Sequence, residues 1–370
     1  MRFLAIGIGK AGSRIVNELV ETEKKMPTKT FTPLVFNTSK ADSIGLNNIK
    51  DDRKFIVGES LRGQGTGGDS KLGAEVAAEE IDKITSRIEQ YQRSEHDAIL
   101  LVAGLGGGTG GGMLPVFARE LSDRSDVPIY GLGVLPSRDE GEVYALNAAR
   151  SIKTSISDLN GLILVDNSAF VSPREGSSGY EKVNKEIAKR MTLLSRAGEV
   201  SPGGEVGEKI IDASEVLNTI GRGGITTLGY SMEQVETKKG FLGILKRKEE
   251  VGDLGKTTRI VSIIRRAVKG KLTLPCDYRS AERALVLVAG SPELLSRMGT
   301  DKARKWLESE IVGHDVRAGD YPIPRAHFVA AVVALSGLTD VPRIRELFEV
   351  ASEFQRKEEE SRRGFDLPPL

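Results

Sequence analysis

A run of glycines between two apolar segments constrains this chain more than any other feature. Residues Gly104 to Met113 have the sequence GLGGGTGGGM and join the strand-like run AILLVAG to the helix-like run MLPVFAREL. Because glycine has no Cβ, such a turn lets backbone N–H groups converge on phosphate oxygens, and the following helix adds partial positive charge. The alternative is a flexible linker, but linkers are seldom flanked this closely by an apolar strand and an apolar helix. The run predicts a phosphate-binding turn made by Gly106, Gly107, Gly108, Thr109, Gly110 and Gly111.

The first half of the chain alternates short apolar runs with amphipathic stretches. The runs are FLAIGI, TPLVFN, KFIVG, AILLVAG, IYGLGVL and GLILVD. Strands that are apolar throughout and separated by helices indicate a parallel sheet covered on both faces. Ligands of such sheets bind outside the carboxyl ends of the strands, and the glycine-rich segments fall at those ends. We therefore predict an α/β fold with a Rossmann-like parallel sheet.

The pattern changes near Tyr180. Apolar residues recur there at helical spacing, which predicts a long amphipathic helix. A loop-like segment, AGEVSPGGEVG, follows, and then a second set of strands with helices between them: GITTLGYS, RALVLVAG and HFVAAVVALSG. We expect a nucleotide-binding domain in residues 1–178, a central helix in 179–200, a smaller mixed α/β C-terminal domain in 201–352 and a short charged tail in 353–370.

Two more glycine-rich loops accompany the run, GIGKAG at residues 7–12 and RGQGTGGDSKLG at 62–73. The first also fits a dinucleotide-binding oxidoreductase. That class needs an acidic residue at the end of the second strand to bind the ribose, where this chain has Asn37. The P-loop spacing is also absent, because Lys10 is followed by Ala11. Three phosphate-facing loops favour a nucleoside triphosphate.

Composition narrows the class of protein. The chain has 53 Lys and Arg residues against 52 Asp and Glu, which gives no indication of nucleic acid as a partner. The single cysteine, Cys276, excludes an intrachain disulfide and a Cys-rich zinc site, and we expect it to pack as a small apolar residue. The histidines form no ligand pattern, so no dedicated metal site is expected. No stretch predicts a signal peptide or a transmembrane span, which favours a cytoplasmic protein.

The segment GGGTGGG at residues 106–112 resembles the GGGTG(T/S)G signature of the tubulin/FtsZ superfamily, with Gly111 in place of the usual hydroxyl residue. The other loops occur in the order of that family, and the likeness extends to about residue 350. The loops are residues 7–14, Asn37-Thr38, residues 62–73, PSRDEGE at 136–142, and VDN ending at Asn167. Residues 62–73 resemble the γ-phosphate loop of the family, and residues 136–142 resemble its ribose loop. The short tail and the loop containing Lys10 are more similar to the archaeal CetZ branch than to FtsZ, which carries a linker and a C-terminal peptide.

The resemblance implies that the nucleotides are GTP and GDP. It implies that Glu140 contacts the ribose. It further implies that Asn167 and Asn184 recognise the guanine edge and that Tyr180 stacks near the base. Where FtsZ usually has an arginine four residues after the matched glutamate, this chain has Tyr144. The remaining contacts implied by the family loops are Gly9, Lys10, Ala11, Gly12, Ser13, Arg14, Asn37, Gly67 and Gly68.

Asp212 and Glu215, in the segment IIDASEVL, are the candidates for hydrolysis. Their spacing places both carboxylates on one face at the start of an amphipathic helix, and it is also the pattern of a capping box. Both roles can hold together. The resemblance implies that two acidic residues of one subunit reach the nucleotide of the next subunit and orient the attacking water. Mg²⁺ is expected with the triphosphate.

We therefore predict a GTPase that assembles head to tail into a cytoskeletal filament, serving cell shape, motility or division. Residues 237–256 contain the basic apolar sequence GFLGILKRK. They predict lateral contacts between filaments or peripheral contact with a membrane surface, and a solvated loop is the alternative.

Two other functions remain as alternatives. A nicotinamide-dependent oxidoreductase would be stabilised against heat by NAD rather than by GTP. A nucleotide-gated scaffold would bind GTP and its partners without releasing phosphate, even at high protein concentration.

Overall fold

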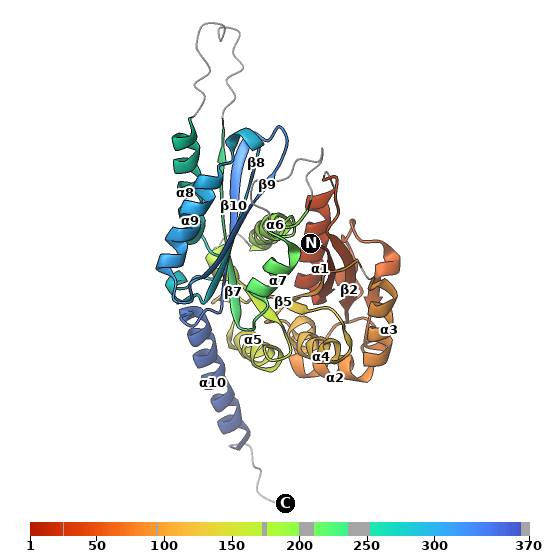
Figure 1. The fold of residues 1–370 in the computed structure, drawn as a ribbon. Coiled ribbons are helices and arrows are strands. Elements are labelled where there is room, and N and C mark those ends of the chain that lie inside the picture. The colour runs from red at the N-terminus through yellow and green to blue at the C-terminus, as the bar shows by residue number, and fades with distance from the viewer. Residues whose placement is uncertain (25, 94, 172–175, 200–210, 236–251, 364–370) are drawn as a thin grey trace, which may run out of the picture.

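The computed structural model describes the chain except for residues 25, 94, 172–175, 200–210, 236–251 and 364–370 (Figure 1). Within the described residues, ten strands form one sheet. The strands are β1 (Phe3–Ile8), β2 (Phe31–Asn37), β3 (Lys54–Ile56), β4 (Ala98–Gly104), β5 (Ile129–Leu135), β6 (Gly161–Asp166), β7 (Ile225–Gln234), β8 (Arg283–Gly290), β9 (Asp315–Pro322) and β10 (Phe328–Ser336). The predicted α/β fold class is confirmed.

Strands β1 to β6 are parallel and lie in the order β3-β2-β1-β4-β5-β6. The chain first adds strands to one side of β1 and then continues on the other side, so the order reverses between β1 and β4. A reversal of this kind leaves a crevice at the carboxyl ends of the two strands, where α/β proteins bind their ligands. The fold therefore places the ligand site beside the residues that follow β1 and β4.

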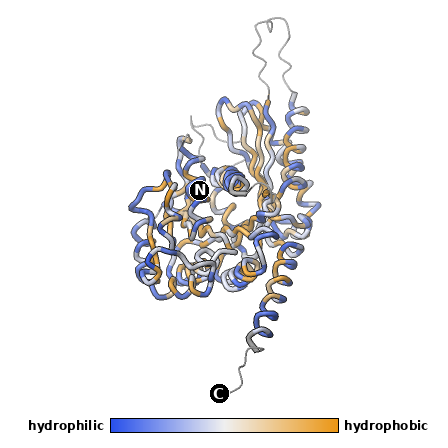
Figure 2. Tube along the Cα trace, turned by 180° about the vertical axis from the view of Figure 1, so that it is seen from behind, coloured by the Kyte–Doolittle hydropathy of each residue, from blue (hydrophilic) through white to orange (hydrophobic). Residues whose placement is uncertain are grey.

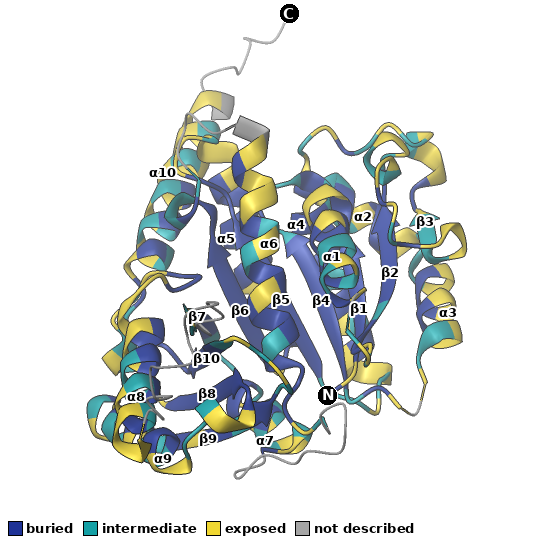
Figure 3. Ribbon diagram, turned by 90° about the horizontal axis from the view of Figure 1, so that it is seen from above, coloured by how far each residue is buried: buried dark blue, intermediate teal, exposed yellow. Residues whose placement is uncertain are grey.

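Helices cover both faces of this parallel region. They are α1 (Gly9–Glu23), α2 (Ser70–Glu79), α3 (Ile81–Tyr91), α4 (Gly108–Arg124), α5 (Glu142–Ser155) and α6 (Gly176–Leu194). Leu4 and Ile6 of β1 pack with α2 to α5 on one face, whereas Phe3 and Ala5 pack with α1 and α6 on the other. Figure 3 shows the buried strands with α1 and α6 lying across one face. Burial on both faces explains the uninterrupted apolar sequence of the strands.

The second set of strands continues the same sheet. Strand β7 pairs in parallel with β6 through Leu162–Ile225 and Ile163–Thr226, after which β10 and β8 add antiparallel and β9 adds parallel to β8. The helices of this half are α7 (Ala213–Ile220), α8 (Asp253–Lys269), α9 (Arg297–Glu310) and α10 (Pro342–Arg363). The central helix was predicted at residues 179–200 and lies at Gly176–Leu194. The domain boundaries themselves stay a prediction.

Helix α10 joins the two halves. Its first turns pack on α5, where Phe348 and Ala351 contact Leu146 and Ala149, and its later turns extend beyond the body of the molecule (Figure 1). Figure 2 shows hydrophobic residues concentrated along the strands and hydrophilic residues on the outer helices. No helix in the described part of the chain has the length and apolar character needed to span a membrane.

The contact between α1 and β4 allows no side chain at Gly12. A β-carbon on Gly12 would collide with the carbonyl oxygen of Val102, so Gly12→Ala must push α1 away from the sheet. We expect the free energy of unfolding, measured by urea titration, to fall by about 1–3 kcal/mol. Gly252→Ala is the matched control, because a β-carbon there would meet no atom within 4 Å. Equal urea midpoints for the two variants would contradict the packing described here.

Candidate functional site

The glycine run forms the first turn of α4. We expected the helix to begin at Met113, but it begins at Gly108, with Gly107 at its N-cap. The first N–H groups of a helix have no partner within the helix, and they carry its partial positive charge. Because α4 starts just beyond the carboxyl end of β4, the run presents these N–H groups at the crevice between β1 and β4.

The loop after β1 lies directly against the run. Gly9 begins α1 with a φ of 68°, in the left-handed region that favours glycine, and a β-carbon there would lie 3.0 Å from the backbone nitrogen of Gly110. Ser13 is buried and donates a hydrogen bond of 2.6 Å from Oγ to the carbonyl oxygen of Gly9. Gly12 is buried against β4 as described above. The other predicted residues of this loop are exposed on the same turns: Lys10, Ala11 and Arg14.

The second and third loops also meet at the run. The hydroxyl oxygens of Thr38 and Thr109 are 2.7 Å apart, and the backbone N–H of Gly65 donates to the carbonyl of Thr38 at 3.1 Å. A β-carbon on Gly108 would collide with Oγ1 of Thr66. Four segments that are far apart in the sequence therefore converge on one short stretch of backbone.

The residues around this point fit a nucleotide. A β-carbon on Gly67 or Gly68 would meet no atom within 4 Å, so the space beside the third loop is open. Asn37 and Asn167 are buried, yet Nδ2 of Asn37 and Oδ1 of Asn167 have no hydrogen-bond partner among the described residues. Buried polar atoms are normally paired. The Asn37 donor suits a phosphate or sugar oxygen, and the Asn167 acceptor suits an N–H group of a base.

Glu140 and Tyr180 are in contact at the loop of residues 136–142, which resembles the ribose loop of the family. Oε1 of Glu140 accepts hydrogen bonds from the backbone N–H of Ser137 at 2.8 Å, from Oγ of Ser137 at 2.9 Å and from the hydroxyl of Tyr180 at 3.1 Å. The carboxylate is therefore held in one orientation by its own loop and by α6. Asn184 lies one helical turn beyond Tyr180, is half-buried and makes no side-chain hydrogen bond to another described residue.

Asn147 of α5 is a site residue that the sequence analysis missed. Its Nδ2 donates to the carbonyl oxygens of Gly68 and Gly106, each at 2.9 Å, and its Oδ1 accepts from Oγ of Ser70 at 2.7 Å. One buried amide thus ties the third loop to the glycine run. The available signal was a polar residue inside the apolar run ALNAA, between Leu146 and Ala148.

Asp212 and Glu215 form the predicted capping box at the start of α7. The Glu215 N–H donates to Oδ1 of Asp212 at 2.8 Å, and the Asp212 N–H donates to Oε2 of Glu215 at 3.3 Å. The Ser214 hydroxyl and then the Glu215 N–H lower the pKa of Asp212, so its exposed carboxylate is ionised at neutral pH. The two carboxylates are therefore held rigidly, with Asp212 exposed and Glu215 half-buried.

The acidic pair and the candidate nucleotide site lie at opposite ends of α6. Tyr180 near the start of α6 contacts Glu140, whereas Gly198, just beyond its end, packs against the backbone of Asp212 and Ala213. A helix of 19 residues is roughly 28 Å long. Figure 3 shows α6 running alongside the strands of the sheet, with α7 near the amino ends of the strands. Within one chain, the two sites are too far apart to share a ligand.

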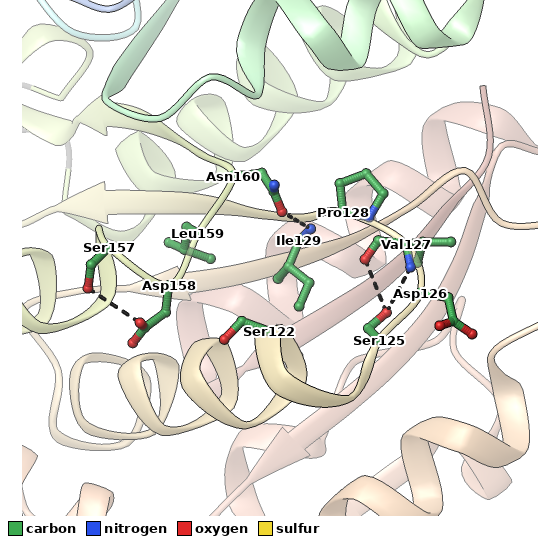
Figure 4. Close-up of a pocket in the computed structure, with 10 residues that line it drawn as sticks. All are labelled: Ser122, Ser125, Asp126, Val127, Pro128, Ile129, Ser157, Asp158, Leu159 and Asn160. Carbon is green, nitrogen blue, oxygen red and sulfur yellow. Dashed lines mark hydrogen bonds between the residues drawn. The ribbon is translucent and has the colours of Figure 1, made fainter.

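A separate pocket of the amino-terminal half lies away from the glycine loops. Its volume is about 450 Å³, and it is lined by Ser122, Ser125 to Ile129 and Ser157 to Asn160. Figure 4 shows these side chains. It lies at the amino ends of β5 and β6, whereas the glycine loops lie at the carboxyl ends of the strands. Asp126 and Asp158 are among the residues that line it. Phosphate would be repelled there, so this pocket is not the candidate site.

Neither a metal cage nor a reactive thiol accompanies the pocket in the part of the chain described. No group of three or more His, Cys, Asp or Glu residues there is arranged to hold a metal ion. Burial raises the pKa of the Cys276 thiol to about 12, so it is protonated at neutral pH. Cys276 packs beside the core of the sheet as a small apolar residue.

The fold and the four convergent segments define a nucleotide-binding protein of the tubulin type. Residues 2–173 match the GTPase domain of the Tubulin/FtsZ family, and residues 175–353 match the C-terminal domain of tubulin-like CetZ. The tubulin-like protein CetZ1 of Haloferax volcanii is 44% identical over 98% of this chain and 94% of its own length. The chain belongs to the CetZ family of tubulin-like proteins. The predicted family and the predicted class of enzyme, a GTPase, are confirmed.

Two solved structures resemble the molecule closely. The GDP-bound monomer of Haloferax volcanii CetZ1 has a TM-score of 0.85 at 41% identity and is covered over 100% of its chain and 96% of this one. The GTPγS-bound protofilament of CetZ2 from the same organism has a TM-score of 0.85 at 35% identity, with 100% of that chain and 97% of this one covered.

Replacing Asn147 with alanine should leave the buried carbonyl group of Gly106 and the half-buried carbonyl group of Gly68 without this partner. We expect the free energy of unfolding to fall by about 1–3 kcal/mol and nucleotide affinity to weaken, because each unpaired group costs its desolvation. Urea unfolding and the nucleotide-induced rise in Tm measure the two effects. Ser155→Ala on the same helix is the control, because its buried hydroxyl bonds only to Ser151 within the helix. An unchanged nucleotide-induced shift in Asn147→Ala would refute the assignment.

Proposed function

We propose that the protein binds GTP in the crevice between β1 and β4 and hydrolyses it where a second copy stacks head to tail. The filaments formed in this way serve cell shape, motility or division in the cytoplasm, where GTP is made. One observation carries the proposal: the acidic pair of α7 is held at the end of α6 opposite the pocket. A second subunit must therefore supply it. The GTPγS-bound protofilament of CetZ2 supports the same arrangement.

Binding follows from backbone groups more than from side chains. The N–H groups at the start of α4 and the open third loop would hold the phosphates, with no Cβ to block their approach. The fixed carboxylate of Glu140 would accept a ribose hydroxyl, and Oδ1 of Asn167 would accept an N–H of guanine. Tyr180 and Asn184 would approach the base from α6.

Hydrolysis needs an oriented water and stabilised charge rather than covalent chemistry. Asp212 and Glu215 of the neighbouring subunit would orient the water, and the capping box fixes their carboxylates beforehand. Mg²⁺ would arrive with the triphosphate and neutralise its charge, because this ion binds through phosphate oxygens and water as readily as through protein ligands. The hydroxyl of Thr109 and the two carboxylates are the groups of this chain suited to it.

Head-to-tail stacking joins two different surfaces, so repeated contacts give an open filament unless the rotation closes a ring. The further prediction, lateral or membrane contact through residues 237–256, stays a prediction. Residues 237–251 lie outside the described part of the chain, and Leu254 at the start of α8 is 74% exposed. The oxidoreductase alternative is disfavoured by Asn37 at the end of β2, where that class has an acidic residue.

Amide substitutions separate the catalytic role of the acidic pair from its capping role. Asparagine caps a helix as well as aspartate, and glutamine replaces glutamate in a capping box. Asp212→Asn and Glu215→Gln should therefore keep the fold and GTP affinity but lower turnover by roughly 100-fold or more. Phosphate release and GTP titration measure these quantities. Asp212→Ala should also lose turnover, with longer-lived filaments.

Turnover per molecule should rise with protein concentration, because each site needs a neighbour. Wild-type turnover in both amide variants would leave Asp212 and Glu215 with a capping role only. No phosphate release from the wild-type protein, even at high protein concentration, would instead support the non-hydrolysing scaffold. A turnover rate per molecule that is the same at all protein concentrations would contradict the shared site.

A further inference from the structure

A buried arginine of α10 reaches the pocket from the far end of the chain. The Arg343 side chain is 6% exposed and lies in the first turn of α10. Its Nη2 donates to the carbonyl oxygen of Pro136 at 2.8 Å, and its Nε lies 3.4 Å from Oδ1 of Asp166, a carboxylate that is 2% exposed. One guanidinium therefore holds two loops that follow neighbouring strands, β5 and β6.

A second, more exposed layer repeats this connection. Arg138 pairs through both Nε and Nη2 with the two carboxylate oxygens of Glu346, each at 2.7 Å, and Nη1 of Arg343 lies 3.0 Å from the same carboxylate. The Arg138 backbone N–H also donates to Oγ of Ser168 at 3.1 Å. The start of α10 and the two loops are thus linked to one another in a closed network.

Each loop carries one of the groups that we assign to the nucleoside. Glu140 lies four residues beyond Pro136, and Asn167 directly follows Asp166. Asp166 Oδ1 also accepts the backbone N–H of Ser168 at 3.0 Å, which fixes the short turn that begins at Asn167. Arg343 and this turn therefore share one oxygen, so any movement of the guanidinium is passed to the base-recognition residue.

We propose that Arg343 is a positioning residue for nucleoside recognition, which holds the ribose and base loops in register so that α10 sets the selectivity for guanine. The inference rests on the proposed function and specifies the donor to Asn167 Oδ1 as the exocyclic 2-amino group of guanine. Guanine offers a ring N–H and a 2-amino group, whereas hypoxanthine lacks the amino group. If Asn167 loses its alignment, the difference in binding affinity between GTP and ITP should therefore become smaller.

If Arg343 had a purely structural role, its loss would change the affinities for GTP and ITP by the same factor. Breaking a buried ion pair destabilises a protein whatever its ligand, because it leaves a buried charge uncompensated. The ratio of the two affinities cancels that effect, since both nucleotides bind the same folded state. The ratio therefore reports alignment of the base loop rather than stability.

The test compares Arg343→Met with Arg345→Met in the full-length protein. Arg345 is two residues further along α10 and pairs at 2.8 Å with Asp340, which is outside both loops. Displacement of a fluorescent GTP analogue by GTP and, separately, by ITP gives the two Kd values. We expect the ratio of the ITP Kd to the GTP Kd to fall by roughly tenfold in Arg343→Met, the effect of one directed hydrogen bond, and to stay at the wild-type value in Arg345→Met.

Asp166→Asn supplies a second variant should Arg343→Met not fold. It keeps an oxygen for the Ser168 N–H and removes the charge that pairs with Arg343, so the ratio should fall in the same direction by less. A wild-type ratio in Arg343→Met, or in Asp166→Asn where only that variant folds, would overturn the inference while leaving GTP binding intact. An equal fall in Arg345→Met would also overturn it. A wild-type protein with no preference for GTP over ITP would instead contradict the guanine recognition of the proposed function.

Discussion

The backbone at the start of α4 is the constraint on which the rest of the structure depends. The N–H groups from Gly107 onward are available at the end of β4, and the loops after β1, β2 and β3 approach them closely because glycines leave the space. Backbone groups recognise phosphate without regard to the base or sugar. Base and ribose must therefore be recognised by other segments, and we propose Glu140 and Asn167, which follow the next two strands, for these roles.

In the proposed mechanism, the length of α6 divides the chemistry between two molecules. The helix holds the base side of the pocket at one end and the acidic pair of α7 at the other, and it is too long for the two to meet. Capping explains why Asp212 and Glu215 are rigid within one chain, and the separation explains why they have nothing to act on there. Assembly and hydrolysis become a single requirement, which connects the fold to filament turnover.

Local features of the sequence predict much of this arrangement, and long-range contacts account for what it misses. The strands, the glycine run and the capping box each depend on residues that are adjacent in the chain. The start of α4 at Gly108 was missed because helix propensity disfavours glycine, and tertiary packing overrides that preference. Asn147 and Arg343 were missed because the loops that they hold are 41 to 207 residues away in sequence. The continuation of the sheet from β6 to β7 is a tertiary property of the same kind.

Complementation between two inactive variants tests the shared site most directly. A β-carbon at Gly107 would have the Gly104 carbonyl oxygen as its nearest neighbour, at 4.0 Å. We therefore expect Gly107→Val to fold while its side chain obstructs the phosphate turn. Asp212→Asn keeps the pocket and loses the carboxylate. Each variant alone should release little phosphate, whereas an equimolar mixture should recover turnover, because Gly107→Val subunits supply acids to the pockets of Asp212→Asn subunits. A mixture that co-assembles and stays inactive would contradict the account.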